Sequence, residues 1–209
     1  MTRGLFIVFE GPDRSGKSTQ VKLLSAWLRK NRFKTRITRE PGGARISEAI
    51  RRILLDPKNR INALTEILLY EAARAQHTAD VILPALKAGR IVISDRFAMS
   101  TTAYQGYGRK IPIRTVETLN KIATCGLNPD ITIVLNIPDR IFNERERRAL
   151  KLSGPDRMER ASSNFRKRVN KAYKTLSRRP GIIRINAAEP IEAIHDKLRA
   201  AIAKKLKIK

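Results

Sequence analysis

The residues best suited to chemistry lie in a short glycine-rich segment near the N-terminus. Residues 11–18 read Gly-Pro-Asp-Arg-Ser-Gly-Lys-Ser, which matches the G-x-x-x-x-G-K-[ST] spacing of a phosphate-binding loop. In such a loop the glycines let backbone N–H groups converge on phosphate oxygens, Lys17 supplies a positive charge, and Ser18 supplies a hydroxyl ligand for magnesium. An apolar run precedes the segment and a helical pattern follows it. The segment therefore predicts a nucleotide-binding site.

Three other residues carry groups that phosphoryl transfer uses, since this reaction depends on positioning and on positive charge around the transferred group. Arg14, inside the loop, can bring a guanidinium to that group. Asp95 and Arg96 follow an apolar run, where the carboxylate can orient water on magnesium near Ser18 and the guanidinium can face an acceptor phosphate. The alternatives are a surface arginine and a pair that only caps a helix. The predicted catalytic residues are Arg14, Lys17, Asp95 and Arg96, and the predicted metal ligands are Ser18 and Asp95.

A helical segment places an aromatic ring and a guanidinium on one face. Tyr70 and Arg74 are four residues apart, so both can face the same ligand. A tyrosine at such a position can equally belong to the hydrophobic core. The spacing alone leaves both roles open for Tyr70.

Alternating strands and helices must position these groups. Strand-like runs cover residues 5–9, 35–38, 91–94, 131–135 and 182–185, and helical patterns cover 17–31, 44–55, 63–88, 100–106, 113–124, 139–149, 164–177 and 191–207. Gly89 and Gly126 are predicted to end helices. This alternation of strands and helices, together with the phosphate-binding loop, predicts an α/β fold: a three-layer α/β/α P-loop NTPase with a five-stranded parallel sheet. In such a fold ligands bind over the carboxyl ends of the strands.

Length and composition favour one domain. A chain of 209 residues suits a single globular domain over 1–209, and the highly charged segment at about 145–160, interrupted by Gly154-Pro155, is typical of a mobile lid. No long apolar run or signal peptide is present, so we expect a cytoplasmic protein. Cys125 is the one cysteine, which excludes an intramolecular disulfide and predicts a small buried residue.

The chain is strongly basic. Its 44 Lys and Arg outnumber 19 Asp and Glu, for a net charge of +25, and residues 141–209 hold 20 basic and 7 acidic residues. Such an excess attracts polyanions, including nucleotides, while a solvated surface that favours solubility is the simpler interpretation.

Seven motifs together make the chain resemble the thymidylate kinases, which are P-loop nucleoside monophosphate kinases. They are the segments 11–19, 38–43, 94–97, 100–106, 128–130 and 156–159, and the pair Tyr70 and Arg74. The resemblance implies transfer of the γ-phosphoryl group of ATP to dTMP, giving dTDP and ADP, with Mg²⁺. It also implies that the protein is a homodimer, that it binds these two substrates, and that it requires neither a membrane nor nucleic acid.

The resemblance also implies roles for individual residues in binding dTMP. Tyr70 would stack on thymine, Arg74 would bond its carbonyl edge, and Thr101 and Gln105 would contact the base. Tyr104 would pack under the deoxyribose and crowd out a 2′-hydroxyl, while Asp13 would lie near the 3′-hydroxyl. The implied dTMP-binding residues are Asp13, Arg39, Tyr70, Arg74, Arg96, Thr101, Tyr104 and Gln105, of which Arg39 and Arg96 would bind the acceptor phosphate.

The resemblance places the ATP site at the phosphate-binding loop and the lid. The implied ATP-binding residues are Gly11, Pro12, Asp13, Arg14, Ser15, Gly16, Lys17, Ser18, Thr19, Arg145 and Arg148. Members of the family differ in whether the loop or the lid supplies the main catalytic arginine, and we assign it here to Arg14. Phe97 stands where the family often has Tyr or His, and Asn136 where many members have Asp.

Two other functions fit parts of the pattern. A P-loop kinase for another deoxynucleotide or for a nucleoside would share the fold, but two guanidiniums at Arg39 and Arg96 argue against a neutral acceptor. A basic nucleic-acid-binding ATPase would use the charge of the C-terminal third. Aromatic residues make up only 5% of the chain, few for a base-stacking surface.

Overall fold

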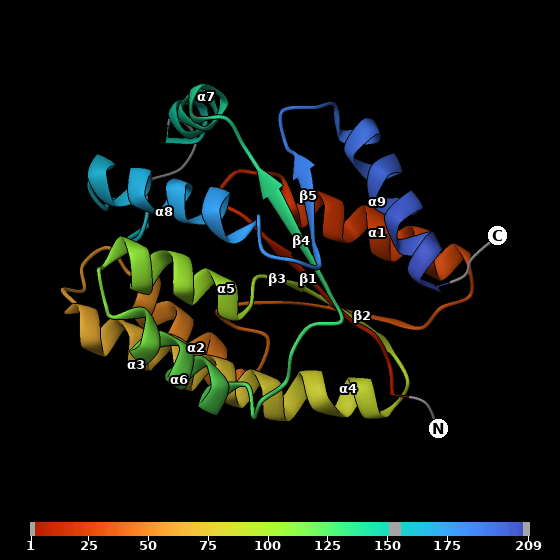
Figure 1. Ribbon diagram of the computed structural model, residues 1–209. Helices are drawn as coiled ribbons and strands as arrows, with labels where there is room; N and C mark the ends of the chain where they lie inside the picture. The colour runs from red at the N-terminus through yellow and green to blue at the C-terminus, as the bar shows by residue number, and fades with distance from the viewer. Residues whose placement is uncertain (1–2, 151–155, 207–209) are drawn as a thin grey trace.

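Five parallel strands form the central layer of the molecule (Figure 1). The computed structural model describes residues 3–150 and 156–206. The strands are β1 (Phe6–Glu10), β2 (Thr35–Arg39), β3 (Ile91–Asp95), β4 (Ile131–Asn136) and β5 (Ile182–Asn186), in the order β2-β3-β1-β4-β5. Every neighbouring pair is parallel, which confirms the predicted five-stranded parallel sheet.

Each strand ends one residue later than its apolar run, on a polar side chain. These end residues are Glu10, Arg39, Asp95, Asn136 and Asn186. The extension arises because the hydrogen-bonded ladder joins backbone groups and does not depend on side-chain polarity. The register sets Asp95 opposite both Phe9 of β1 and Arg39 of β2, so polar groups gather along one edge of the sheet.

Helices cover both faces of the sheet (Figure 1). They are α1 (Lys17–Lys30), α2 (Arg45–Leu55), α3 (Ala63–His77), α4 (Leu83–Lys87), α5 (Ala98–Thr101), α6 (Ile113–Ala123), α7 (Asp139–Leu150), α8 (Ser163–Leu176) and α9 (Ile191–Leu206). On one face Ile7 and Phe9 pack with Leu24 of α1 and Leu198 of α9. On the other face, Phe6, Val8 and Val92 pack with Ile82, Leu86 and Phe97, while Val134 packs with α8 residues such as Phe165. The strand period of two divides the apolar side chains between these layers.

Two predicted helices contain π-helical turns. The stretch predicted over 63–88 is α3, the turn η1 (Thr78–Ile82) and α4, and the stretch predicted over 100–106 is α5 followed by η2 (Thr102–Gly108). Gly89 and Gly126 do follow helix ends, with φ of 70° and 71°. These left-handed values are available to glycine without strain, which confirms both as stops.

The prediction of a buried Cys125 is wrong, because this side chain is exposed. Cys125 lies in the reversal after α6, where the N–H of Gly126 bonds the Lys121 carbonyl at 3.0 Å. A turn that closes a helix on the surface exposes its side chains whatever their polarity. No helix within residues 3–150 and 156–206 combines the length and the apolar character needed to cross a membrane.

Candidate active site

The glycine-rich segment forms a tight loop between β1 and α1. Gly11 has φ of 138°, and a Cβ placed on it would lie 2.6 Å from the Leu135 carbonyl oxygen, so a side chain is excluded there. The Lys17 ammonium folds back over the loop and donates to the carbonyls of Gly11 at 3.1 Å and Pro12 at 2.8 Å. Lys17 is only 6% exposed, and burial together with the nearby Arg96 charge lowers its pKa to about 8.

Ser18 and Asp95 meet at the carboxyl edge of the sheet. The Ser18 hydroxyl donates to Asp95 Oδ2 at 2.5 Å, which joins the first turn of α1 to the end of β3. A hydroxyl and a carboxylate are hard oxygen ligands, and Mg²⁺ commonly takes only one or two protein oxygens and completes its shell with water and phosphates. No group of three His, Cys, Asp or Glu suited to a metal occurs among the described residues. The pair therefore fits magnesium that is held jointly with a nucleotide.

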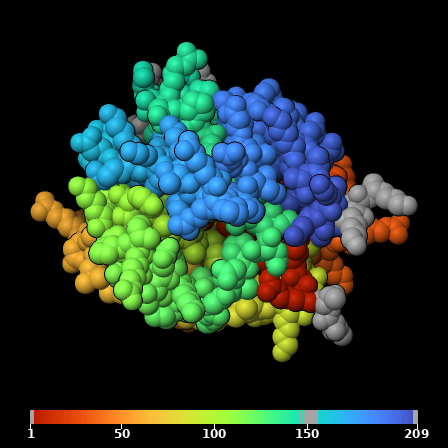
Figure 2. Space-filling model, viewed as in Figure 1, coloured from red at the N-terminus to blue at the C-terminus, as the bar shows by residue number. Residues whose placement is uncertain are grey.

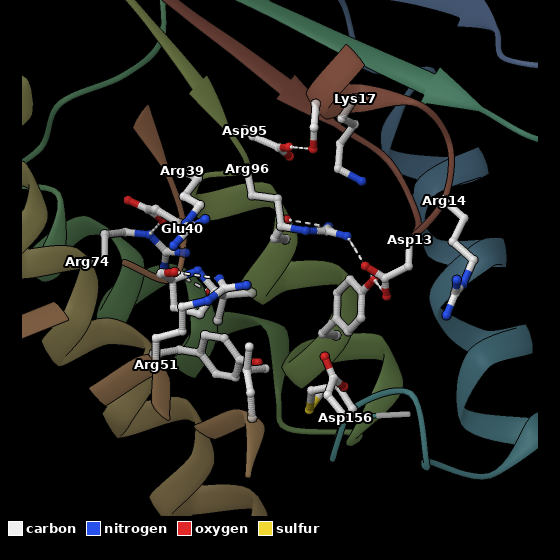
Figure 3. Close-up of a pocket in the computed structure, with 18 of the residues that line it drawn as sticks. Asp13, Arg14, Lys17, Arg39, Glu40, Arg51, Arg74, Asp95, Arg96 and Asp156 are labelled. Atoms are coloured by element: carbon white, nitrogen blue, oxygen red, sulfur yellow. Dashed lines mark hydrogen bonds and ion pairs between the residues drawn. The ribbon is translucent and has the colours of Figure 1, made fainter. Parts of the chain in front are cut away.

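Arg96 is held by five hydrogen bonds within the site. Its guanidinium donates to the Gly11 carbonyl at 3.0 Å and to Asp13 Oδ1 at 2.6 Å, and Figure 3 shows it directed towards Asp13. The hydroxyls of Ser100, Tyr173 and Tyr104 accept from the same group at 3.0–3.2 Å. Burial opposes its charge, but Tyr104 and Asp13 outweigh burial and raise the pKa of Arg96. Arg96 thus remains a fixed positive charge.

Asp13 and Tyr104 complete this cluster. The Tyr104 hydroxyl donates to Asp13 Oδ2 at 2.7 Å, and the Arg96 guanidinium lies 5.2 Å from the centre of the Tyr104 ring. Burial would raise the pKa of Asp13, but the charges of Arg96 and Lys17 lower it to about 2. Asp13 is therefore ionised at neutral pH and accepts hydrogen bonds.

Arg74 is held in place before any ligand arrives. The side chain is 2% exposed and donates to Glu40 Oε2 at 2.8 Å, to Thr101 Oγ1 at 2.9 Å and to Glu71. Asn120 Oδ1 and the Phe97 carbonyl accept from it at 3.0 and 3.1 Å. Burial opposes the charge, while Glu40 and Glu71 raise the pKa of Arg74. A guanidinium bonded on so many sides is oriented rigidly.

One cavity of about 430 Å³ brings most of the predicted residues together, a volume in the range of nucleotide-sized ligands. The predicted residues that line it are Asp13, Arg14, Gly16, Lys17, Ser18, Thr19, Arg39, Tyr70, Arg74, Asp95, Arg96, Thr101, Tyr104 and Gln105. Figure 3 shows Arg39, Arg51 and Arg74 on one side of this space and Lys17, Asp13 and Arg14 on the other. The remaining predicted loop residues, Gly11, Pro12 and Ser15, shape the loop without lining this cavity.

Two residues of the predicted lid contact the loop. Glu159 Oε1 accepts from the Arg14 guanidinium at 2.6 Å, and Arg145 donates to the Arg14 carbonyl at 3.1 Å and to the Ala187 carbonyl at 2.9 Å. Arg145 therefore bridges the phosphate loop and the turn after β5. Residues 151–155 of the predicted lid and the side chain of Arg148 lie outside the described part of the chain.

Arg157 lies in the segment predicted as the lid, but it does not line the cavity. It donates to Glu66 Oε2 and to the Leu54 carbonyl, each at 2.6 Å. Gln105 and Arg109 donate to the same buried carboxylate at 2.9–3.0 Å. Burial would raise the pKa of Glu66, but these donors lower it. Glu66 thus ties the chain after residue 155 to α3 and η2.

Sequence reasoning missed Glu10 and Tyr173. The buried Glu10 carboxylate accepts from the backbone N–H groups of Phe97 and Ser100 at 2.9 and 3.1 Å, and from the Tyr173 hydroxyl at 3.1 Å. Burial raises the pKa of Glu10 even though the Arg96 charge opposes the shift. Asp95 was predicted because it is an acid at the end of an apolar strand, and the same pattern would have predicted Glu10. Tyr173 has the spacing of an ordinary core residue and gives no such signal.

The fold and this cavity define a class of protein. A phosphate loop after the first strand, an acid at the end of the adjacent strand and several guanidiniums facing one nucleotide-sized space are the parts of a P-loop kinase.

Comparison with known proteins identifies the family. A family model for thymidylate kinase matches residues 9–198. Thymidylate kinase from Halothermothrix orenii is 45% identical over 193 residues, which cover 92% of this chain and 93% of that protein. The one from Pelotomaculum thermopropionicum is 46% identical over 203 residues, covering 95% and 93%. The crystal structure of thymidylate kinase from Ehrlichia chaffeensis superposes with a TM-score of 0.76 at 30% identity, over 96% and 98% of the two chains. The chain belongs to the thymidylate kinase family, and its reaction is the phosphorylation of dTMP to dTDP.

Proposed function

We propose that this chain transfers the γ-phosphoryl group of ATP to dTMP within the cavity described above, as a single domain with residues 145–160 acting as its lid. The convergence of Lys17, the Ser18–Asp95 pair and the Arg96–Asp13 pair on one 430 Å³ space carries this proposal. Such a space can hold a donor and an acceptor phosphate side by side, and positioning of this kind supplies much of the catalysis in phosphoryl transfer.

The donor phosphates occupy the loop of residues 11–19. Lys17 then leaves its two carbonyl partners for phosphate oxygens, which hold its ammonium in the charged form. Ser18 and Asp95 hold magnesium, which supplies neutralisation of charge on the donor phosphates. Arg145, between the loop and the turn at Ala187, covers the outer end of the donor.

The acceptor phosphate binds to Arg96 and Arg39. Arg96 is already charged and oriented, while Arg39 is exposed and held by Glu48 at 3.3 Å, so it can turn towards a phosphate. Arg51 lines the same side of the cavity and adds a third guanidinium. A neutral nucleoside would bring no anion to these three guanidiniums, which favours a monophosphate as the acceptor.

The base and sugar of dTMP lie against α3 and η2. Tyr70 stacks on thymine, and Arg74, Thr101 and Gln105 form the polar wall that faces the edges of the base. Because Arg74 and Thr101 are bonded to each other at 2.9 Å, the wall keeps its shape when empty. Asp13 receives the 3′-hydroxyl, and the Tyr104 ring, held by Asp13, fills the space that a 2′-hydroxyl would need.

Arg14 acts as the built-in arginine finger. It leaves Glu159 as the lid closes and stabilises the negative charge that spreads over the transferred group. The sequence of events is thus substrate binding, lid closure, release of Arg14 from Glu159 and in-line transfer. A homodimer and a cytoplasmic location are further parts of this proposal, and they rest on the family resemblance and on composition.

A coupled ADP-release assay with ATP and Mg²⁺ tests the proposal. The acceptors compared are dTMP, dUMP, dGMP and thymidine, with single-stranded DNA as a possible stimulant. Turnover chiefly with dTMP is expected. Equal turnover with thymidine would contradict the acceptor-phosphate site, and stimulation by DNA without monophosphate turnover would contradict the kinase assignment.

A further inference from the structure

The outer side of α8 is a row of positive charges. Lys167, Lys171, Lys174 and Arg178 are all exposed and are separated by four, three and four residues. At 3.6 residues per turn they share one side of the helix and its C-terminal extension, a row of about 16 Å. The opposite side, which includes Phe165, packs in the core. Figure 1 and Figure 2 show α8, in light blue, running across the front of the molecule with its outer side uncovered.

Acidic residues are missing from this part of the sequence. Residues 160–188 contain nine Lys and Arg and no Asp or Glu. Lys174 pairs with Asp139 at 3.0 Å. Lys167, Lys171 and Arg178 have no acidic partner within residues 3–150 and 156–206. Like charges one turn apart destabilise a helix, so the row keeps an unfavourable repulsion that a bound polyanion would relieve.

A groove extends this basic surface to the edge of the sheet. It is open to solvent, has a volume of about 420 Å³ and is lined by Lys174 and by Arg184 of the edge strand β5. Asn136 and Asn186 from the ends of β4 and β5 also line it. Guanidinium, ammonium and amide groups are the donors that proteins offer to phosphate oxygens. We call Lys167, Lys171, Lys174, Arg178 and Arg184 together the α8 face.

We propose that the α8 face binds the phosphodiester backbone of nucleic acid without sequence preference. A linear row of cations spaced by single helical turns matches a linear array of phosphates, and the +25 net charge attracts such a polyanion from a distance. The α8 face contains no aromatic residue for base stacking, so contacts are made to the backbone. None of its residues lines the cavity assigned to the reaction, so phosphoryl transfer does not require this contact.

The chemistry of the α8 face favours nucleic acid over a lipid surface. Helices that lie on membranes combine cations with large apolar side chains that enter the lipid. The exposed large apolar residues in the described part of the chain lie elsewhere, and none belongs to α8 or β5. An anionic lipid surface would therefore meet positive charge on the α8 face but no large apolar side chain that could enter it.

Fluorescence anisotropy with a labelled, mixed-sequence DNA duplex tests the proposal on the full-length protein. The variant combines Lys167→Gln, Lys171→Gln and Arg178→Gln. A matched control combines Lys30→Gln, Lys34→Gln and Arg36→Gln, which removes the same charge from exposed positions at the end of α1, in the turn after it and in β2. If each of the five cations neutralises one phosphate, log K against log[salt] has a slope of about −4.5, and the α8 variant loses about three fifths of it. The control keeps the wild-type slope, and both variants keep wild-type dTMP turnover.

Four results would overturn the proposal. Equal weakening in both variants would assign binding to overall charge, and displacement of the duplex by ATP would assign it to the nucleotide cavity. Failure of the wild type to bind the duplex at about 50 mM salt would remove the activity itself. Binding to phosphatidylserine-containing vesicles in place of the duplex would make the surface a membrane contact.

Discussion

Arg14 of the phosphate loop and Glu159 form an ion pair with an N–O distance of 2.6 Å. The pair joins Arg14, which we assign to the transferred phosphoryl group, to the carboxylate of Glu159. Glu159 follows residues 151–155, which lie outside the described part of the chain. Glu159 is itself held, because its Oε2 accepts from the Asp156 N–H at 3.2 Å and its N–H donates to Asp156 Oδ1 at 2.8 Å. In the proposed mechanism, departure of Arg14 from this turn couples the phosphate loop to closure of the lid.

Replacing Arg14 tests that assignment. Arg14→Ala should lower kcat by about 1,000-fold, the lower end of what an arginine finger contributes, and should leave the Kd for dTMP within about twofold. Single-turnover kinetics and dTMP titration measure the two effects. Arg32→Ala is the matched control, because Arg32 has a φ of 65° close to the 61° of Arg14. A change confined to dTMP binding would show that Arg14 belongs to the acceptor site.

Lys17→Ala should nearly abolish turnover. Loss of the Lys17 ammonium, which folds over the loop, removes a positive charge from the donor phosphates, and we expect kcat/KM to fall by about 100-fold or more. Thermal unfolding of the variant should stay cooperative. Near-normal turnover would contradict the phosphate-loop assignment.

The lowered pKa of Lys17 predicts a pH dependence. In the free enzyme this pKa is about 8, and the protonated form binds phosphate, so kcat/KM for ATP should decline as the pH rises through about 8. Bound phosphates stabilise the charged form, so kcat should hold to higher pH. Initial rates between pH 6.5 and 10 measure both, and parallel profiles for kcat and kcat/KM would argue against this origin.

Asp95→Asn should increase the magnesium requirement. A carboxamide keeps the shape of the side chain but loses its charge, so the Mg²⁺ concentration for half-maximal rate should rise about tenfold or more. Asp196→Asn, which removes an exposed carboxylate paired with Arg199, is the control and should not change it. An unchanged Mg²⁺ dependence in Asp95→Asn would place the metal elsewhere.

Tyr173→Phe tests a positioning role for a buried hydroxyl. The change removes the hydroxyl that contacts Arg96 at 3.0 Å and Glu10 at 3.1 Å, and it keeps the ring. Loss of a hydrogen bond to a charged group, about 1.5 kcal/mol, should raise the KM for dTMP roughly tenfold with little change in the KM for ATP. Tyr107→Phe at an exposed tyrosine should change neither. A rise in both constants would indicate a general structural effect.

The sequence by itself determined the five strands, the phosphate loop and the order of the helices. These features depend on short-range information, because hydrophobic periodicity and the spacing of Gly11, Gly16 and Lys17 act within one element and its flanking turn. Asp95 and Arg96 were predicted as site residues for the same reason, since they directly follow an apolar run, and both line the cavity.

The tertiary structure alone decided how these groups are partnered. Glu10 meets Tyr173 across 163 positions, Arg14 meets Glu159 across 145 and Arg157 meets Glu66 across 91. Such pairs depend on how layers pack, which no local pattern encodes, and the same limit explains why Cys125 was wrongly expected inside. Burial then sets the chemistry, since removal of Lys17 and Glu10 from water shifts their pKa values in ways that composition does not reveal.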